Sequence, residues 1–221
     1  MSIQTFQDEL DALASGVGRR RVVLHAGCGP WTPEALHPVF RSPEWREMRL
    51  DIDEDARPNL VSSITHLPLA DASVDAVWTS HTVEHLYPHE VSLAFAEFSR
   101  VLAPGGFLLL TLPDLQRVAE MVAADQLTDV AYVSPVGPIT PLDMIFGHRV
   151  SIASGRKYMA HHTGFTAKLL AQTLLSARFS RIKVERNRFS LWACAQKPAL
   201  VRSTRSGWRK TKLESGNTQE R

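Results

Sequence analysis

Two glycines at the end of an apolar run are the residues of this chain best suited to holding a ligand. Residues 22–26 read Val-Val-Leu-His-Ala and lead directly into Gly27-Cys28-Gly29. Such an apolar run is typical of a buried strand. Glycine permits both a tight turn and a close approach of the backbone to a bound molecule. In doubly wound α/β folds, small cofactors bind beyond the carboxyl end of the first strand. The glycines therefore predict a ligand-binding turn.

Three further polar segments follow predicted strands. Asp51 ends the second strand, Ser80-His81 follows the fourth, and Asp114 follows the fifth. A carboxylate is a pure acceptor with room for two donors, so Asp51 is suited to bind the two hydroxyls of a ribose. Because the carboxyl ends of parallel strands meet at one edge of a sheet, these segments are expected to share that edge.

Strands and helices alternate along the chain, which predicts an α/β fold. We expect a doubly wound, mostly parallel, seven-stranded Rossmann-like sheet with an antiparallel pair of C-terminal strands at its edge. The expected strands are 21–25, 45–52, 59–64, 74–80, 107–112, 181–186 and 189–195, and the expected helices are 8–14, 32–42, 90–102, 114–124 and 166–177.

The composition is that of one ordinary folded domain. The 221 residues are 44% hydrophobic and 22% charged, and no apolar run approaches the roughly 20 residues that cross a bilayer. The first residues lack the pattern of a signal peptide. Two cysteines do not make a disulfide framework, which favours a reducing, cytoplasmic setting. Cys28 is expected to be a packing residue rather than a nucleophile.

The charge is unevenly distributed along the chain. Basic residues outnumber acidic ones in residues 198–221, although the whole chain carries a net charge of only +2. Residues 1–197 are therefore expected to form the folded domain, and 198–221 a disordered basic tail. A solvated tail without a partner is the favoured interpretation. Binding to nucleic acid or an anionic surface is the alternative, which Trp208 keeps open.

Several segments together resemble the class I S-adenosylmethionine-dependent methyltransferases, and most closely their small-molecule, type-11-like branch. The resemblance spans roughly residues 20–195. It is most specific in the Asp-x-Ser-x-Asp-x-Val segment and in Arg-Val-Leu-x-Pro-Gly-Gly. The matching segments are residues 23–30, 49–53, 67–77, 98–106 and 162–166.

The resemblance implies a role for particular residues toward S-adenosyl-L-methionine. The glycine turn would lie under the methionine part, Asp51 and Asp53 would take the ribose, Ser63 or Ile64 would flank the adenine, and Ser80 and His81 would line the floor near the sulfonium. His25 stands where the family usually has an acid. The cofactor-binding residues implied are His25, Gly27, Cys28, Gly29, Asp51, Asp53, Ser63, Ile64, Ser80 and His81.

Histidines are the candidate bases, because imidazole titrates near neutral pH. His81, His161 and His162 are the predicted catalytic residues, and His85 is expected to be structural. The letters of His81-x-x-Glu84-His85 resemble a metal motif, but His81 is expected at a strand end rather than on a helix. We therefore expect no metal ligands.

Residues 127–165 are expected to form a lid-like, substrate-specific insert. Arg149, Arg156 and Lys157 within it are candidates to hold an acidic group of the substrate.

The sequence thus predicts a small-molecule methyltransferase that uses S-adenosylmethionine, most simply for O-methylation by in-line transfer. Its oligomeric state is left open. Two alternatives remain: a cofactor-binding protein without catalysis, which the histidine at position 25 would explain, and a nucleic-acid methyltransferase that uses the basic tail. A dinucleotide-dependent enzyme is disfavoured, because Thr32 stands where that fingerprint needs a third glycine.

Overall fold

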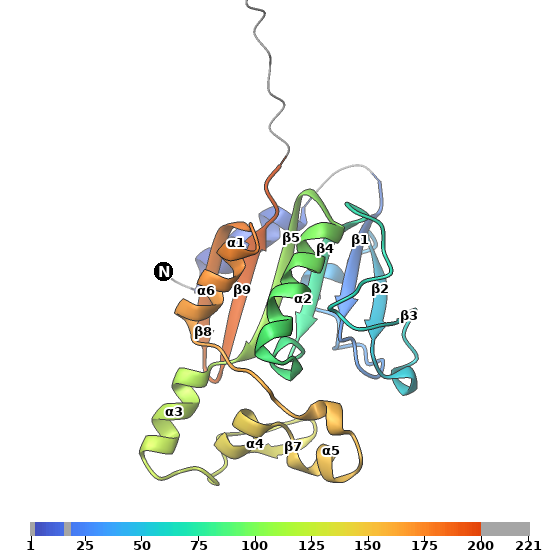
Figure 1. The fold of residues 1–221 in the computed structure, drawn as a ribbon. Helices are drawn as coiled ribbons and strands as arrows, with labels where there is room; N and C mark the ends of the chain where they lie inside the picture. Colours follow the sequence, from blue (N-terminus) through green and yellow to red (C-terminus); the bar gives the residue numbers. More distant parts are fainter. Residues whose placement is uncertain (1–2, 16–18, 200–221) are drawn as a thin grey trace, which may run out of the picture.

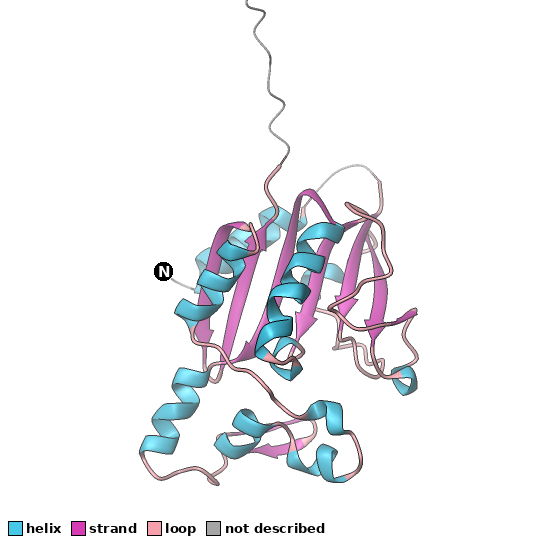
Figure 2. Cartoon of the chain, viewed as in Figure 1, coloured by secondary structure: helices cyan, strands magenta, loops and turns pink. Residues whose placement is uncertain are grey.

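One seven-stranded sheet forms the body of the protein (Figures 1 and 2). The structure, a computed structural model, describes residues 3–15 and 19–199. The strand order is β3-β2-β1-β4-β5-β9-β8. The first five strands run parallel, while β9 is antiparallel to both β5 and β8, as the sequence predicted. The strands are β1 (Arg21–Ala26), β2 (Trp45–Asp51), β3 (Leu60–Val61), β4 (Val74–Ser80), β5 (Leu102–Pro113), β8 (Ser180–Asn187) and β9 (Ser190–Gln196).

Helices cover both faces of the sheet, which explains why its central strands are almost continuously apolar. On one face, α2 (Pro88–Val101) and α6 (Ala167–Ser176) pack their buried side chains, such as Phe98 and Leu174, into the larger core. On the other face, α1 (Ile3–Ala14) and the short 3₁₀ helix η1 (Pro38–Phe40) enclose a smaller aromatic core. The sheet is thereby a rigid base for whatever its strand ends carry.

The helix expected over residues 32–42 is absent, and that prediction was wrong. Residues 33–36 form turns, and only η1 is helical in this stretch. Thr32-Pro33-Glu34 has the letters of a helix start, but Pro38 and Pro43 follow too soon. A proline disfavours helical geometry in the residue before it and removes a backbone donor, so no longer helix can form.

Other boundaries moved less. β4 has the bounds that the sequence predicts, and Asp114 and Thr166, the first residues of two expected helices, cap α3 (Leu115–Ala123) and α6. The strand expected at 59–64 shrinks to the two residues of β3, at the edge of the sheet. β5 begins at Leu102 rather than Phe107, because Leu102 already pairs with Val74 of β4, ahead of an irregularity in the register of these two strands.

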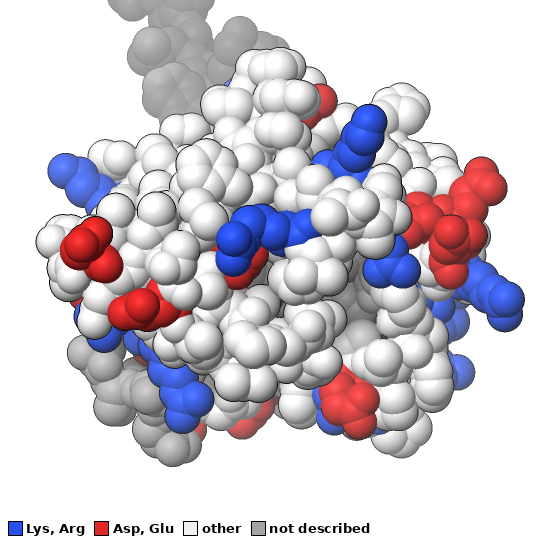
Figure 3. Space-filling model, turned by 90° about the horizontal axis from the view of Figure 1, so that it is seen from below, with Lys and Arg blue, Asp and Glu red and all other residues white. Residues whose placement is uncertain are grey.

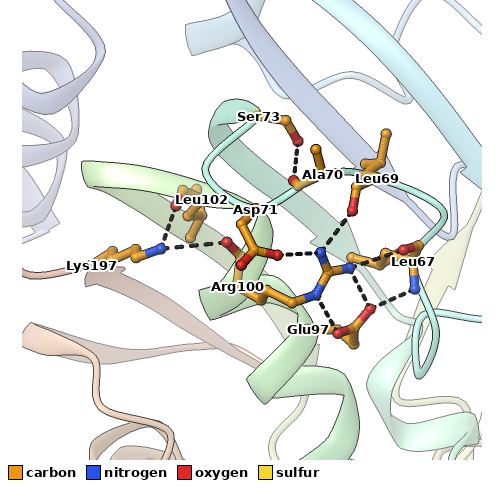
Figure 4. Close-up of polar contacts among 9 residues, drawn as sticks. All are labelled: Leu67, Leu69, Ala70, Asp71, Ser73, Glu97, Arg100, Leu102 and Lys197. Atoms are coloured by element: carbon orange, nitrogen blue, oxygen red, sulfur yellow. Dashed lines mark hydrogen bonds and ion pairs between the residues drawn. The ribbon is translucent and has the colours of Figure 1, made fainter.

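The Asp-x-Ser-x-Asp-x-Val segment (residues 71–77) and the Arg-Val-Leu-x-Pro-Gly-Gly segment (residues 100–106) contact each other through Arg100 (Figure 4). Its guanidinium donates to the carbonyls of Leu67 at 2.9 Å and Leu69 at 2.7 Å, and pairs with Asp71 at 2.8 Å. Glu97 binds it on the other side at 2.6 Å, which holds the pKa of Glu97 below its usual value. Arg100 thus fixes the loop before β4 to the end of α2, which makes these motifs structural in this fold.

Residues 127–165, the lid from here on, lie below the sheet in Figure 1, at the carboxyl ends of the parallel strands. Their small core joins Ile139 and Met144 to Val118 of α3. The lid contains the hairpin β6 (Tyr132–Ser134) and β7 (Gly137–Ile139), the helices α4 (Pro141–Phe146) and α5 (Arg149–Ala153), and the 3₁₀ helix η4 (Lys157–Met159).

The two remaining predictions concern the basic C-terminal tail and membrane-spanning segments. Residues 200–221, almost all of the expected basic tail including Trp208, lie outside the described residues. In the part of the chain that is described, no helix has the length and apolar character needed to cross a bilayer.

His37 is held in the aromatic core beside η1. Its ring lies 5.2 Å from that of Trp78 and 5.6 Å from that of Trp192, and its Nδ1 accepts a hydrogen bond from the amide of Val39. Burial, together with the charge of Arg41, lowers the pKa of His37 to about 4. The folded protein therefore holds this imidazole neutral where the unfolded chain would protonate it.

Acidification from pH 6.5 to 4 is expected to destabilise the fold through His37 by about 2 kcal/mol, because the unfolded state binds the proton first. His37→Asn keeps an acceptor for the amide of Val39 but cannot titrate. Urea unfolding at several pH values should therefore show a shallower loss of stability in this variant. Parallel curves for both proteins would contradict the assignment.

Candidate active site

The glycine turn sits between β2 and the segment after β4. The amides of Gly27 and Cys28 both donate to the carbonyl of Leu50, at 2.9 and 3.0 Å. Gly27 and Gly29 both have left-handed backbones, with φ of +69° and +58°. A Cβ at Gly27 would overlap the side chain of Thr82, whereas a Cβ at Gly29 would meet open space. The turn is thus packed on one side and open on the other.

Cys28 is buried within this turn, and its neighbours make it unreactive. Burial raises the pKa of its thiol to about 11, so the thiolate needed for nucleophilic attack is scarce at neutral pH. This agrees with the expected packing role of Cys28.

Asp51 lies directly against the glycine turn. Its carboxylate accepts a hydrogen bond from the amide of Gly29 at 2.7 Å and from the amide of Asp53 at 2.9 Å. These two contacts fix its orientation and leave further lone pairs for other donors. Asp53 caps the 3₁₀ helix η2 (Glu54–Ala56). The two acids predicted for a ribose are therefore neighbours at the end of β2.

Ser63 and Ile64 follow β3 at the same edge of the sheet. The backbone reaches this edge through the amide of Ser62, which donates to the carbonyl of Asp51 at 2.9 Å. The hydroxyl of Ser63 is hydrogen-bonded to that of Thr65 at 2.7 Å, and Ile64 is buried in the larger core. Ser63 thus follows the residue that contacts Asp51, and its assignment to the adenine stays a prediction.

The side chain of His25 lies on a buried face of the sheet and is not directed toward the carboxyl end of β1. Its Nδ1 lies 2.7 Å from Oε1 of Glu47, and its ring lies beside Trp78 in the face covered by α1. Glu47 on β2, a partly exposed carboxylate, is a neighbour that the sequence did not predict. The assignment of His25 to the cofactor stays a prediction.

The segment after β4 brings together His81 and Glu84. His81 has a left-handed backbone with φ of +50°, and its Nδ1 lies 3.1 Å from Oε1 of Glu84. Burial lowers the pKa of His81, but the carboxylate outweighs it and raises the pKa overall. Ser80 accepts a hydrogen bond from the hydroxyl of Thr82 through its carbonyl. His81 is partly exposed, whereas Glu84 is buried.

The lid is attached to this segment by several contacts. The amides of His162 and Thr163 donate to the carbonyl of Glu84, at 2.9 and 3.2 Å. The ring of His162 stacks on Tyr87 with a centroid distance of 4.1 Å. Nδ1 of His161 lies 2.8 Å from the carbonyl of Met144, within the lid itself.

A second attachment reaches the acids of β2. The hydroxyl of Tyr158, in η4, donates to the carboxylate of Asp53, which raises the pKa of Tyr158 to about 12. Nothing in the sequence pointed to this contact, because the two residues are far apart along the chain. The lid therefore contacts both Asp53 at the end of β2 and the segment after β4.

Two other predicted groups have structural partners. Arg149 binds the buried Asp143 through its Nε at 2.8 Å and so holds α4 to α5, whereas Arg156 and Lys157 are exposed. Asp114 caps α3 and pairs with Arg186 at 2.5 Å, which accounts for its carboxylate without a ligand.

The surface on the lid side is largely uncharged (Figure 3). Lysines, arginines, aspartates and glutamates are scattered across the face shown, and no single basic patch dominates it. The lid contributes exposed apolar side chains, among them Phe146, Val150 and Tyr158. The described part of this face thus combines exposed apolar side chains with scattered charges.

Comparisons with known proteins agree with this geometry. A family model described as a methyltransferase domain matches residues 24–110, which hold the glycine turn, Asp51 and His81. A malonyl-[acyl-carrier protein] O-methyltransferase of Erwinia billingiae is 32% identical over 61% of this chain and 56% of its own length. An enzyme of the same name from Dechloromonas aromatica is 29% identical over 70% of this chain and 62% of its own length.

The chain thus spans little more than half the length of these curated relatives. Among solved structures, the 1,6-didemethyltoxoflavin-N1-methyltransferase of Burkholderia thailandensis, which holds S-adenosylhomocysteine, shares the fold. Its TM-score is 0.54 at 17% identity, over 86% of this chain and 77% of that one.

The strand order is that of the class I S-adenosylmethionine-dependent methyltransferase fold. Over residues 24–110, which carry the glycine turn, Asp51 and His81, the chain is similar to the type-11 methyltransferase domain. S-adenosylmethionine is the cofactor that these similarities support.

Gly27→Ala is expected to cost about 3 kcal/mol of folding free energy, about 1 from the left-handed backbone and about 2 from overlap with Thr82. Gly29→Ala is the matched control. It has the same backbone strain without the overlap, so it should cost only about 1 kcal/mol. Chemical denaturation of both variants measures the difference, and equal losses would contradict the packing against Thr82.

Proposed function

We propose that this protein transfers the methyl group of S-adenosylmethionine to a carboxylate oxygen of a small acyl substrate, forming a methyl ester. The supporting observation is the joint placement of the glycine turn, Asp51 and the segment after β4 under an apolar lid. The choice of an oxygen acceptor draws on the similarity to the two malonyl-[acyl-carrier protein] O-methyltransferases.

The residues present are suited to the cofactor. The open side of Gly29 leaves space for a ligand against the backbone, and the fixed carboxylate of Asp51 borders that space. In this proposal Asp51 binds the ribose hydroxyls with Asp53 beside it, Ser63 and Ile64 flank the adenine, and Ser80 and His81 line the floor.

A carboxylate acceptor needs no general base, because it is already ionised at neutral pH. When bound, the cofactor supplies a methyl group on a positively charged sulfur, and the acceptor oxygen displaces that sulfur in line. The protein then has to orient the acceptor and exclude water. An alcohol acceptor would require a base, for which His81, His161 and His162 stay the predicted candidates.

The lid supplies groups suited to such a substrate. Phe146 and Val150 are exposed apolar side chains that could cover an acyl chain, and Arg156 and Lys157 are exposed cations next to Tyr158. Because Tyr158 contacts Asp53, these cations are held near the acids of β2. We assign Arg156 and Lys157 to recognition of the anionic part of the substrate.

Asp51→Ala should abolish the binding of S-adenosylmethionine and S-adenosylhomocysteine, because the ribose loses its acceptor. Isothermal titration calorimetry measures both affinities. Asp55→Ala is the control, since Asp55 is exposed on the same loop and only its backbone amide contacts Asp53. A folded wild-type protein that binds neither ligand, or an Asp51→Ala variant that binds both normally, would contradict the proposed cofactor site.

The acceptor atom is tested with radiolabelled cofactor and panels of acyl thioesters bearing a free carboxylate, of alcohols and of amines. Label on the carboxylate substrates should be released as methanol by mild alkali, because methyl esters hydrolyse. Base-stable label on an alcohol or an amine would overturn the carboxylate assignment. Cofactor binding without transfer to any of the three would favour the non-catalytic alternative.

A further inference from the structure

Three potential metal ligands meet where the lid joins the sheet. Glu84 and His85 lie in the 3₁₀ helix η3 (Val83–His85) after β4, and His161 comes from the lid. Each offers one ligand atom, and these atoms all lie within 4.8 Å of one another. The rings of His85 and His161 are close, with centroids 4.8 Å apart. The fold therefore brings potential ligand atoms from two distant segments of the chain close together.

The carboxylate of Glu84 has an unsatisfied oxygen. Its side chain is only 1% exposed, and while Oε1 contacts His81, Oε2 is buried without a hydrogen-bond partner. A buried anionic oxygen without a partner is unfavourable, so such groups are normally paired or bound to a metal ion. Glu84, which carries this oxygen, also lies beside the imidazoles of His85 and His161. A cation bound among these three side chains would be the missing partner of the oxygen.

His161 is arranged to present a nitrogen lone pair. Nδ1 of His161 lies 2.8 Å from the carbonyl of Met144, so it carries the hydrogen and Nε2 carries the lone pair. A backbone carbonyl that fixes the tautomer in this way is typical of histidines that bind metals.

His85 has a carbonyl near each ring nitrogen, Ala160 at Nδ1 and His81 at Nε2, both at 3.1 Å. A neutral imidazole has only one hydrogen, so one lone pair faces a carbonyl oxygen. A metal ion bound at that nitrogen would take the place of this carbonyl contact.

We propose that Glu84, His85 and His161 form a binding site for a divalent transition-metal ion, which clamps the lid to the corner after β4. Two imidazoles and one carboxylate suit zinc with a position left open, and they also suit manganese or iron. The site differs from the one considered from the sequence, because the third ligand is His161 of the lid and His81 contacts Glu84 instead.

The site does not depend on the proposed methyl transfer. It involves neither the glycine turn nor Asp51. It lies where the lid contacts η3, and not where Tyr158 of the lid contacts Asp53. Its failure would leave the cofactor site untouched, and failure of cofactor binding would leave the metal site testable.

The test uses the full chain, stripped with a chelator and titrated with zinc chloride in a calorimeter. We expect one ion per chain. Glu84→Gln, His85→Ala and His161→Ala should each weaken binding more than about tenfold. His162→Ala is the matched control, since this neighbouring lid histidine stacks on Tyr87 outside the cluster. Circular dichroism checks that each variant is folded.

Hydrogen exchange at the lid amides gives a second readout. Zinc should slow exchange at His162 and Thr163 in the wild type but not in His161→Ala, because the ion then no longer joins the lid to η3. Manganese and cobalt are titrated in parallel. The proposal is overturned if no tested ion binds the folded wild type, or if Glu84→Gln and His161→Ala bind as tightly as the His162→Ala control.

Discussion

The backbone carbonyl of Glu84 accepts hydrogen bonds from two consecutive lid amides, while the side chain of the same residue is buried against His81. The placement of the lid over the strand ends depends on this residue. Glu84 is fixed by η3, and η3 follows β4, which pairs with both β1 and β5 in the middle of the sheet. The backbone of η3 therefore joins the lid directly to the rigid centre of the sheet.

The sheet was predictable because its strands carry their own signal. β4 and β9 are short, largely apolar and bounded by turn residues, so burial and propensity favour the same structure. The region between β1 and β2 shows the opposite case. Thr32-Pro33-Glu34 favours a helix start, but Pro38 and Pro43 restrict the backbone that follows. The start signal is therefore not enough to produce a long helix.

The site was predictable only in part, for a physical reason. Gly27 and Asp51 lie at the ends of adjacent parallel strands, so their proximity follows from the fold. The contacts of Thr82 with Gly27, and of Tyr158 with Asp53, depend on how loops return to the sheet. No local pattern specifies such contacts. The orientation of His25 toward Glu47 also depends on the side of the sheet that its position in β1 faces.

The turn that replaces the expected helix after β1 also changes the electrostatics beside Gly29. A helix beginning there would direct the positive end of its dipole, about half an elementary charge, at a ligand on the glycine turn. Without that helix, a pyrophosphate loses the attraction that holds it in dinucleotide-binding proteins. A ligand bearing a sulfonium meets no such repulsion. The turn and the short η1 that stand in place of the helix thus leave the space beside Gly29 without a positive helix end, which favours a cationic ligand there over an anionic one.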